Sequence, residues 1–363
     1  MVLSEKSKQH VDSCRFCWMC HHICPIGNAT GHERSTARAR ALGLSLVLRG
    51  ALTAEDVAEN IYECAGCGGC RSVCTTGWDP VSFTRDARCQ LAMEGKLPAY
   101  IQKLVQNCLE TGNAYGEKAL CKELTEAIAA HEKKQDTLLL LGTEARYHAP
   151  ELAVKAIRVL EKAGVAFTVA AEEPQTGAEL EFLIGAAQET KTQMETCAKL
   201  LNEYQTVIVY EPEDAKALLQ TYGEYGVKLT AKAVTWPAYL AKLLADGKLA
   251  VKNTGKKAAL QDPFQLARDL EQTEEARAIL ATCAQPTEML LHGGETVWAG
   301  NPLMAAYLPD VMQGVAARRL QNAESLSIPT VVTVGAAEYV SLKAVPQTKT
   351  EILALEELIL CAF

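Results

Sequence analysis

The pattern of apolar and polar positions divides the chain into a helical N-terminal part and a longer part in which strands and helices alternate. From about residue 136, short apolar runs such as "TLLLLG" predict buried strands, and stretches with apolar residues at spacings of three and four predict helices. The predicted order is strand 137–142, helix 149–164, strand 165–171, helix 180–204, strand 206–211 and helix 212–226. Such an alternation predicts a sheet with helices on its faces.

A weaker copy of the same pattern follows residue 252. It predicts a strand at 288–291, a long helix at 301–326, a strand at 330–335 and a short helix at 336–344. Because the order matches the first copy, we interpret the two as an internal duplication of a unit of roughly 110 residues. The predicted domains are therefore 1–135, 136–252 and 253–363.

The N-terminal part contains two predicted helices between two cysteine runs. The stretch 35–50 has apolar residues at helical spacing, and the stretch 53–64 begins with Thr53 and an acidic first turn, which is typical of a helix start. The cysteine runs are therefore expected to lie among helices.

Both cysteine runs, "CRFCWMCHHIC" and "CAGCGGCRSVC", follow the spacing C-x2-C-x2-C-x3-C. Gaps of two residues allow three thiolates from one turn to reach three corners of one iron–sulfur cube, while the fourth cysteine of each run ligates the other cube. This arrangement predicts two 4Fe–4S clusters. Cluster one would be bound by Cys14, Cys17, Cys20 and Cys74, and cluster two by Cys64, Cys67, Cys70 and Cys24.

A zinc site is the alternative interpretation of these cysteines, but structural zinc takes four ligands and leaves the third thiol of each run unexplained. The glycines of the second run, Gly66, Gly68 and Gly69, would let backbone N–H groups approach the cluster sulfides. With a full cysteine set, the neighbouring His21 and His22 are expected to be outer or surface groups. Trp18 and Trp78 are expected to shield the clusters from water.

Composition adds constraints on partners and location. The 363-residue chain is 48% hydrophobic and 22% charged, with a formal charge of −8 and no basic block, which argues against nucleic acid or direct membrane insertion. The polar N-terminus and short apolar runs predict neither a signal peptide nor a membrane span, so a cytoplasmic location is expected, with peripheral association to a membrane complex left open. Six scattered cysteines are expected to pack in the core: Cys89, Cys108, Cys121, Cys197, Cys283 and Cys361.

A helical two-cluster ferredoxin followed by two α/β units resembles the iron–sulfur subunits of the heterodisulfide reductase family. This family includes subunits of glycolate oxidase, anaerobic glycerol-3-phosphate dehydrogenase and lactate-utilisation complexes. The segment "LLLLGTEARYHAPELAVKAIRVLEKAGVAFTV" is similar to the start of the family's first cysteine-rich unit, "LQDPFQLAR" to the start of the second, and "TTGWDP" to the end of the ferredoxin domain. The resemblance implies an α+β multidomain fold, an α-helical ferredoxin followed by two tandem α/β domains of cysteine-rich (CCG) type.

The chain departs from that family at the cysteines of both α/β units, which are therefore degenerate. The family's Cys-Cys-Gly and Cys-x-x-Cys motifs, which hold a noncubane cluster in some members, have no thiols here, so disulfide reduction is not expected. The replacements are Thr143, Gln175, Thr176, Glu211 and Asp214 in the first unit, and Phe264, "LHGGE" at 291–295, Gly335 and Glu338 in the second. A smaller departure is Thr75 after Cys74, where Pro25 follows Cys24.

Two of these replacements could have a role of their own. Glu211 and Asp214 follow a predicted strand, where α/β folds place ligands, so a hard cation or a proton relay is one interpretation. Two carboxylates at the start of a helix are more typical of N-terminal caps, which we favour. "HGGE" lacks a nucleophile elbow and predicts a turn, and no nucleotide-binding motif is present.

The resemblance implies an iron–sulfur electron-transfer subunit without catalytic residues of its own. It would relay electrons between a flavoprotein dehydrogenase or reductase, with FAD on that partner, and a further electron carrier. Two alternatives stay open: an enzyme with a substrate or metal site at Glu211, Asp214 or His292, and a scaffold or assembly subunit with structural clusters. Two cubes predict about eight irons and eight sulfides per chain.

Overall fold

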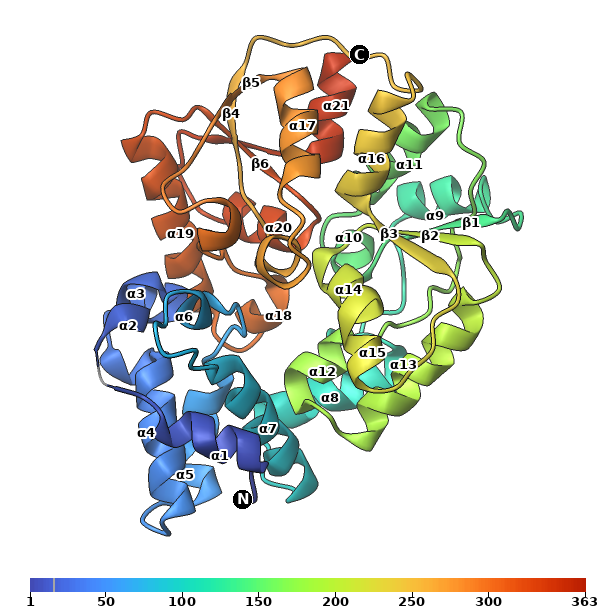
Figure 1. Ribbon diagram of the computed structural model, residues 1–363. Helices are drawn as coiled ribbons and strands as arrows, with labels where there is room; N and C mark the ends of the chain where they lie inside the picture. The colour runs from blue at the N-terminus through green and yellow to red at the C-terminus, as the bar shows by residue number, and fades with distance from the viewer. Residues whose placement is uncertain (16) are drawn as a thin grey trace.

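The N-terminal part is a bundle of short helices (Figure 1, blue) in the computed structural model, which describes residues 1–15 and 17–363. Helices α4 and α5 correspond to the two predicted helices, and Thr53 and Asp56 form a capping box at the start of α5. The elements are α1 (Glu5–Asp12), α2 (Met19–Ile23), α3 (Pro25–Thr30), η1 (Glu33–Ser35), α4 (Ala37–Leu48), α5 (Ala54–Tyr62), α6 (Gly69–Ser72), α7 (Pro80–Met93) and α8 (Ala99–Thr111).

The first sheet has three parallel strands in the order β1-β2-β3, with Leu139 opposite Ile208 and Ile208 opposite Val234. Its strands are β1 (Thr137–Leu140), β2 (Thr206–Val209) and β3 (Lys232–Thr235). Its helical elements are α9 (Lys122–Ala129), α10 (Thr143–Tyr147), α11 (Pro150–Lys162), α12 (Ala178–Ile184), α13 (Gln188–Leu201), α14 (Pro212–Lys216), η2 (Ala217–Thr221), α15 (Tyr222–Glu224) and α16 (Trp236–Ala245).

The second sheet has four parallel strands in the order β5-β4-β6-β7 and stands beside the first (Figure 1, orange and red). Its strands are β4 (Lys257–Leu260), β5 (Gln285–Thr287), β6 (Thr330–Thr333) and β7 (Glu351–Ala354). Its helical elements are η3 (Gln265–Asp269), α17 (Glu274–Cys283), η4 (Gly293–Glu295), α18 (Pro302–Ala305), α19 (Pro309–Ser325), α20 (Ala337–Lys343) and α21 (Leu355–Ala362).

Four predicted elements differ from the structure. The strand predicted at 165–171 is reduced to one bridge between Leu138 and Thr168. The helix predicted at 180–204 is divided at Gly185, which has a positive φ of 57°, and the helix predicted at 301–326 is divided before Pro309, which lacks the N–H to continue it. The strand predicted at 288–291 is irregular, and β5 instead ends at residue 287.

The apolar side chains form one core through both sheets and a second core that joins the N-terminal helices to α12. A third, smaller cluster joins Ile26 and Ala65 of the N-terminal part to Phe264, Trp298 and Met312 of the second sheet unit. This cluster fixes the cysteine runs against the second unit. No helix within the described ranges is both long enough and apolar enough to span a bilayer.

Helix α9 lies before the proposed domain boundary at residue 135 but packs against α11 of the first sheet unit. The two sheets themselves lie within 137–235 and 257–354, on either side of the second proposed boundary. The exact boundaries stay a prediction.

Candidate functional site

The two cysteine runs share a backbone conformation at one equivalent position. Trp18 and Gly68 hold equivalent places in the two runs and both have a left-handed backbone, with φ of 67° and 70°. Each directly precedes a short helix, α2 or α6, and these two helices pack against each other. Glycine adopts this conformation freely, whereas another L-residue pays about 1–2 kcal/mol. The repeated spacing is therefore accompanied by a repeated local feature, a left-handed residue followed by a short helix.

The cysteines of the second run share a small cavity with the last cysteine of the first run. Cys24, Cys64, Cys67 and Cys70 all line it. The backbone N–H of Gly66 donates to Sγ of Cys64 at 3.4 Å, and the N–H of Gly27 donates to Sγ of Cys24 at 3.4 Å. These four thiols are the set that the spacing predicts for cluster two.

The chemistry of this cavity fits a group that supplies positive charge. Burial raises the pKa of Cys67 to about 11 and the pKa of Cys70 well above its usual range. Thiolates at these positions therefore need a cation, and iron in a 4Fe–4S cluster would supply it when bound.

Three arginines surround the same cavity, although they lie far apart in the sequence. The Arg40 side chain is buried, lines the cavity and donates to the Ser35 carbonyl at 3.0 Å. Arg88 donates to the carbonyl of Cys64 at 2.6 Å, and Arg268 donates to the carbonyl of Cys67 at 2.8 Å. Sequence reasoning missed them because no motif or spacing links them to the cysteines.

The thiols predicted for cluster one are less closely gathered. Cys20 is buried, and burial, with the neighbouring thiols of Cys14, Cys24 and Cys17, raises its pKa to about 11. Cys17 is exposed, and Sγ of Cys74 lies 3.2 Å from Oγ1 of Thr76. The place of Cys74 in cluster one stays a prediction. Within residues 1–15 and 17–363, no group of three or more Cys, His, Asp or Glu side chains has the geometry to hold a single metal ion.

The other sequence-based expectations for this region are partly wrong. Trp78 is buried and donates to the His10 carbonyl at 2.6 Å, whereas Trp18 is 50% exposed, with the Arg38 guanidinium 4.1 Å above its ring. His22 is exposed and His21 is half-buried. Among the scattered cysteines, Cys108, Cys197 and Cys283 are buried and Cys89 is half-buried, whereas Cys121 and Cys361 are exposed and do not pack in the core.

A second, larger cavity of about 460 Å³ lies where the N-terminal helices meet both sheet units. Ala65 and Gly66 of the second cysteine run form part of its wall. The resemblance to the cysteine-rich units identified positions that come together here. The wall includes Thr143, Gln175, Thr176, Glu211, Asp214 and Phe264, the residues that the resemblance aligns with the family's cysteines.

The two carboxylates after β2 do not cap their own helix, so the capping prediction is wrong. Glu211 is buried and accepts from the N–H of Ala336, at 3.0 Å from its Oε1, at the start of α20 in the other sheet unit. Asp214 accepts a hydrogen bond from the hydroxyl of Thr176. Within the described part of the chain, no side chain caps α14. Both carboxylates reach this place because Gly142 leaves room: a Cβ there would lie 2.6 Å from Cγ of Glu211 and from Oδ2 of Asp214.

Burial raises the pKa values of the carboxyl groups in this wall. It raises the pKa of Asp214 to about 8 and that of Glu179 to about 7. The pKa values of Glu144 and Glu211 rise well above the usual range, because burial and the charge of Glu213 both disfavour ionisation. The wall is therefore rich in carboxyl groups, and burial together with their closeness to one another disfavours their ionisation in the absence of a positive charge.

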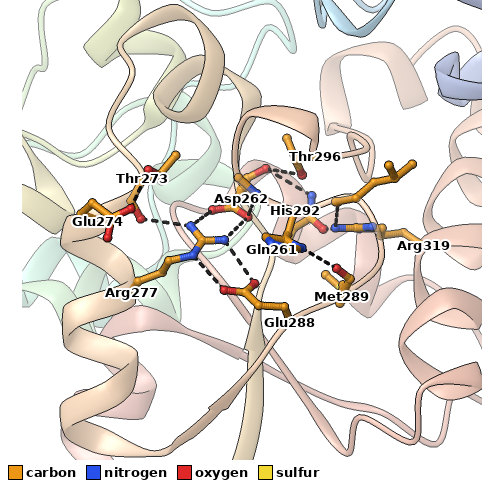
Figure 2. A network of polar contacts seen from close by, with 12 residues as sticks. Gln261, Asp262, Thr273, Glu274, Arg277, Glu288, Met289, His292, Thr296 and Arg319 are labelled. Atoms are coloured by element: carbon orange, nitrogen blue, oxygen red, sulfur yellow. Dashed lines mark hydrogen bonds and ion pairs between the residues drawn. The ribbon is translucent and has the colours of Figure 1, made fainter. Parts of the chain in front are cut away.

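The corresponding part of the second unit is filled by a polar network (Figure 2). Arg277 forms two bonds with Asp262, of 2.6 and 2.8 Å. Arg319 donates to Oε1 of Gln261 at 2.6 Å. Gln261 in turn donates to Glu338 at 3.0 Å. This network holds Glu338 and the segment 291–295, whereas Phe264 of the second unit lines the larger cavity.

The "LHGGE" segment belongs to the same network and forms a turn. Its Gly293 N–H donates to Asp262 at 2.6 Å, and its Leu291 carbonyl and that of the preceding Leu290 accept from Arg319. His292, one of the residues considered for a substrate or metal site, is exposed, and its Nδ1 lies 2.9 Å from the carbonyl of Met289. The structure therefore gives Glu211 and Asp214 a cavity but leaves His292 outside it.

Comparison with known proteins agrees with the cysteine pattern. Residues 10–78 match the family described as 4Fe-4S dicluster domain. The chain is also similar to one polypeptide, designated D, of the dihydromethanophenazine:CoB–CoM heterodisulfide reductase from Methanosarcina mazei. The two are 23% identical over 352 residues, which cover 86% of this chain and 83% of that polypeptide. The chain thus begins with a ferredoxin-type 4Fe–4S domain and is similar, over most of its length, to an iron–sulfur subunit of the heterodisulfide reductase type.

Proposed function

We propose that the chain is an electron-transfer subunit that relays electrons through two 4Fe–4S clusters. The observation that supports this most directly is the cavity shared by Cys24 with Cys64, Cys67 and Cys70, because it joins thiols from both runs in one ligand set. A second cluster would then be held by Cys14, Cys17 and Cys20 together with Cys74.

When bound, such clusters accept and donate single electrons. The residues of this chain would hold the two clusters close together, donate N–H bonds to the ligand sulfurs, and set the electrostatic environment. Arg40 and Arg268 place positive charge beside cluster two, which favours its reduced, more negative form.

The two clusters would differ in their access to a partner. Cys17, Trp18 and Met19 are exposed, so cluster one would lie near the protein surface. Cys64 and Cys24 are buried, and Arg268 of the second sheet unit covers Cys67. We infer that an electron carrier approaches at cluster one, while cluster two faces the interior and the acidic cavity.

The proposed partner is a flavoprotein dehydrogenase or reductase that binds FAD itself, with a further carrier completing the path. The similarity to a named component of a multi-subunit reductase supports a role within a complex. The heterodisulfide in the name of that relative is not proposed as a substrate here, because the thiol positions of both α/β units are replaced. The degenerate units, 136–252 and 253–363, would act as a body that docks the partner.

The proposal is tested by anaerobic purification of the chain together with its bound partners. We expect a flavoprotein to co-purify, and its substrate to bleach the visible absorbance of the clusters, with reoxidation restoring that absorbance. Clusters that accept electrons from neither the flavoprotein nor a low-potential dye would refute the relay and favour a structural scaffold. Turnover of a substrate by the isolated chain would favour the enzyme alternative.

A further inference from the structure

The cavity of about 460 Å³ beside the cysteine runs is not used by the proposed relay. Its volume is many times the roughly 30 Å³ that one water molecule occupies in the liquid, so it can accept a small molecule. All three parts of the chain contribute to the wall: Gly66 from the second cysteine run, Glu144 and Glu211 from the first sheet unit, and Asn301 from the second. It therefore depends on the complete fold.

One buried carboxylate oxygen in the wall accepts no hydrogen bond from the described residues. Glu144 is 4% exposed, and its Oε1 accepts from the hydroxyl of Tyr115 at 2.6 Å. Its Oε2 has no hydrogen-bond donor among the residues that the structure describes. His148 Nε2 lies 3.9 Å away, and burial lowers the pKa of His148, which leaves that ring neutral. An unmade hydrogen bond at a buried acceptor costs about 1–3 kcal/mol, so a ligand donor that reached Oε2 would remove this cost.

The wall of the cavity has more acidic than basic side chains. Lys216 pairs with Asp269 at 2.9 Å and Arg85 pairs with Glu224 at 2.9 Å, and both of these acids also line the cavity. The wall includes three further basic side chains, Lys6, Arg71 and Arg88, and a larger number of acidic ones. The buried carboxyl groups repel one another, which is one cause of their raised pKa values. The acidic wall residues include Glu144, Glu179, Glu211, Glu213 and Asp214. A ligand with positive charge would relieve this repulsion.

The remaining wall is aromatic. Phe264, Trp298 and Phe182 line the cavity, and the first two are buried. Aromatic ring faces attract cations, and the Lys216 ammonium already lies 5.8 Å from the centre of the Phe264 ring. Carboxylates combined with aromatic rings suit an ammonium or guanidinium group on a carbon skeleton, whereas a bare divalent ion would use neither the rings nor most of the volume.

We propose that this cavity binds a small organic cation, a molecule that carries an ammonium or guanidinium group, with Glu144 Oε2 as its principal acceptor and Glu211 and Asp214 as charge partners. The ligand would lie against Ala65 and Gly66, which belong to the loop that holds Cys64 and Cys67. This site goes beyond the proposed electron relay, because it assigns a ligand to the degenerate first unit.

The test is calorimetric titration of the purified cluster-loaded chain with putrescine, agmatine and benzylamine. Benzyl alcohol is the neutral control of nearly the same shape. We expect at least one amine to bind once per chain and at least tenfold more tightly than benzyl alcohol. Failure of all three amines, or equal affinity for benzyl alcohol, overturns the proposal. One-to-one binding of Mg²⁺ or Mn²⁺ that displaces the amine also overturns it, in favour of a metal site.

One variant in the cavity and one control variant on the surface test where the amine binds. Glu144→Gln keeps an acceptor for Tyr115 but removes the charge, and it should weaken the best amine at least tenfold. Glu126→Gln, at an exposed carboxylate on α9, should leave that affinity unchanged. Unchanged cluster absorbance and thermal unfolding confirm that each variant is folded. If Glu144→Gln does not fold, the comparison of amine with alcohol on the native chain still decides. Binding is measured without reducing the clusters, so its failure is distinct from failure of the relay.

Discussion

The guanidinium of Arg40 should raise the reduction potential of the cluster proposed for the smaller cavity. Its side chain is 2% exposed and lines that cavity with Cys24 and Cys64. Substituting Arg40→Met removes one buried positive charge with little change of volume. The reduced cluster has one more negative charge than the oxidised cluster, so the loss of Arg40 disfavours reduction and lowers the potential.

The expected size of the shift follows from Coulomb's law. Unit charges about 8 Å apart interact by about 2 kcal/mol at an effective dielectric constant of about 20. For a one-electron couple, about 1.4 kcal/mol corresponds to about 59 mV, so the potential should fall by about 90 mV. Because Arg40 is buried, added salt should screen this effect only weakly.

The assay is a redox titration followed by electron paramagnetic resonance, with iron content measured for each variant. Arg40→Lys is the matched control, since it keeps the charge and should show less than half of the shift. The Arg40→Met shift should appear in one cluster only. If Arg40→Met retains its iron and neither cluster shifts, or if only the cluster of the first run shifts, the electrostatic account of this cavity is refuted.

Three further predictions concern ligation, pH and backbone. Cys74→Ser should damage the cluster of the first run, although Cys74 lies in the second; spectra showing loss of only the other cluster would contradict the crossed ligation. Burial raises the pKa of Asp214 from 3.8 to about 8, so between these pH values the folded state keeps a proton that the unfolded state loses. The stability that this proton contributes is fully present below pH 3.8 and is lost as the pH rises toward 8. Asp214→Asn should therefore flatten the decline of the free energy of unfolding between pH 6 and 8 by up to about 1.4 kcal/mol per pH unit, measured by urea unfolding; an unchanged slope would refute the raised pKa. Gly68→Ala, at a left-handed position, should destabilise by about 1 kcal/mol, while Gly223→Ala in α15 should be neutral or stabilising; equal unfolding midpoints would contradict this.

Local chemistry made part of this structure predictable. The helix start at Thr53 and the apolar runs of β1, β2 and β6 depend on near neighbours in the sequence, and the structure confirms them. The repeated cysteine spacing likewise corresponds to a repeated backbone, in which Trp18 and Gly68 share one conformation.

The features that escaped prediction depend on distant segments. Glu211 stands at the start of a helix, where capping is the usual role, yet it bonds to Ala336 across the interface between the units. Arg268 reaches Cys67 across 201 positions of sequence. Glu144 becomes part of an acidic cavity only when the fold brings Asp214 and Glu213 beside it. No periodicity or motif in the sequence predicts such contacts.

The most direct test of the central claim is a single preparation of the chain, loaded anaerobically with iron and sulfide, assayed for both elements and titrated with reductant under electron paramagnetic resonance. The account predicts about eight irons and eight acid-labile sulfides per chain, and two paramagnetic centres that appear and disappear reversibly. Four or fewer irons, or eight irons in clusters that cannot be reduced, would contradict a relay through two 4Fe–4S clusters.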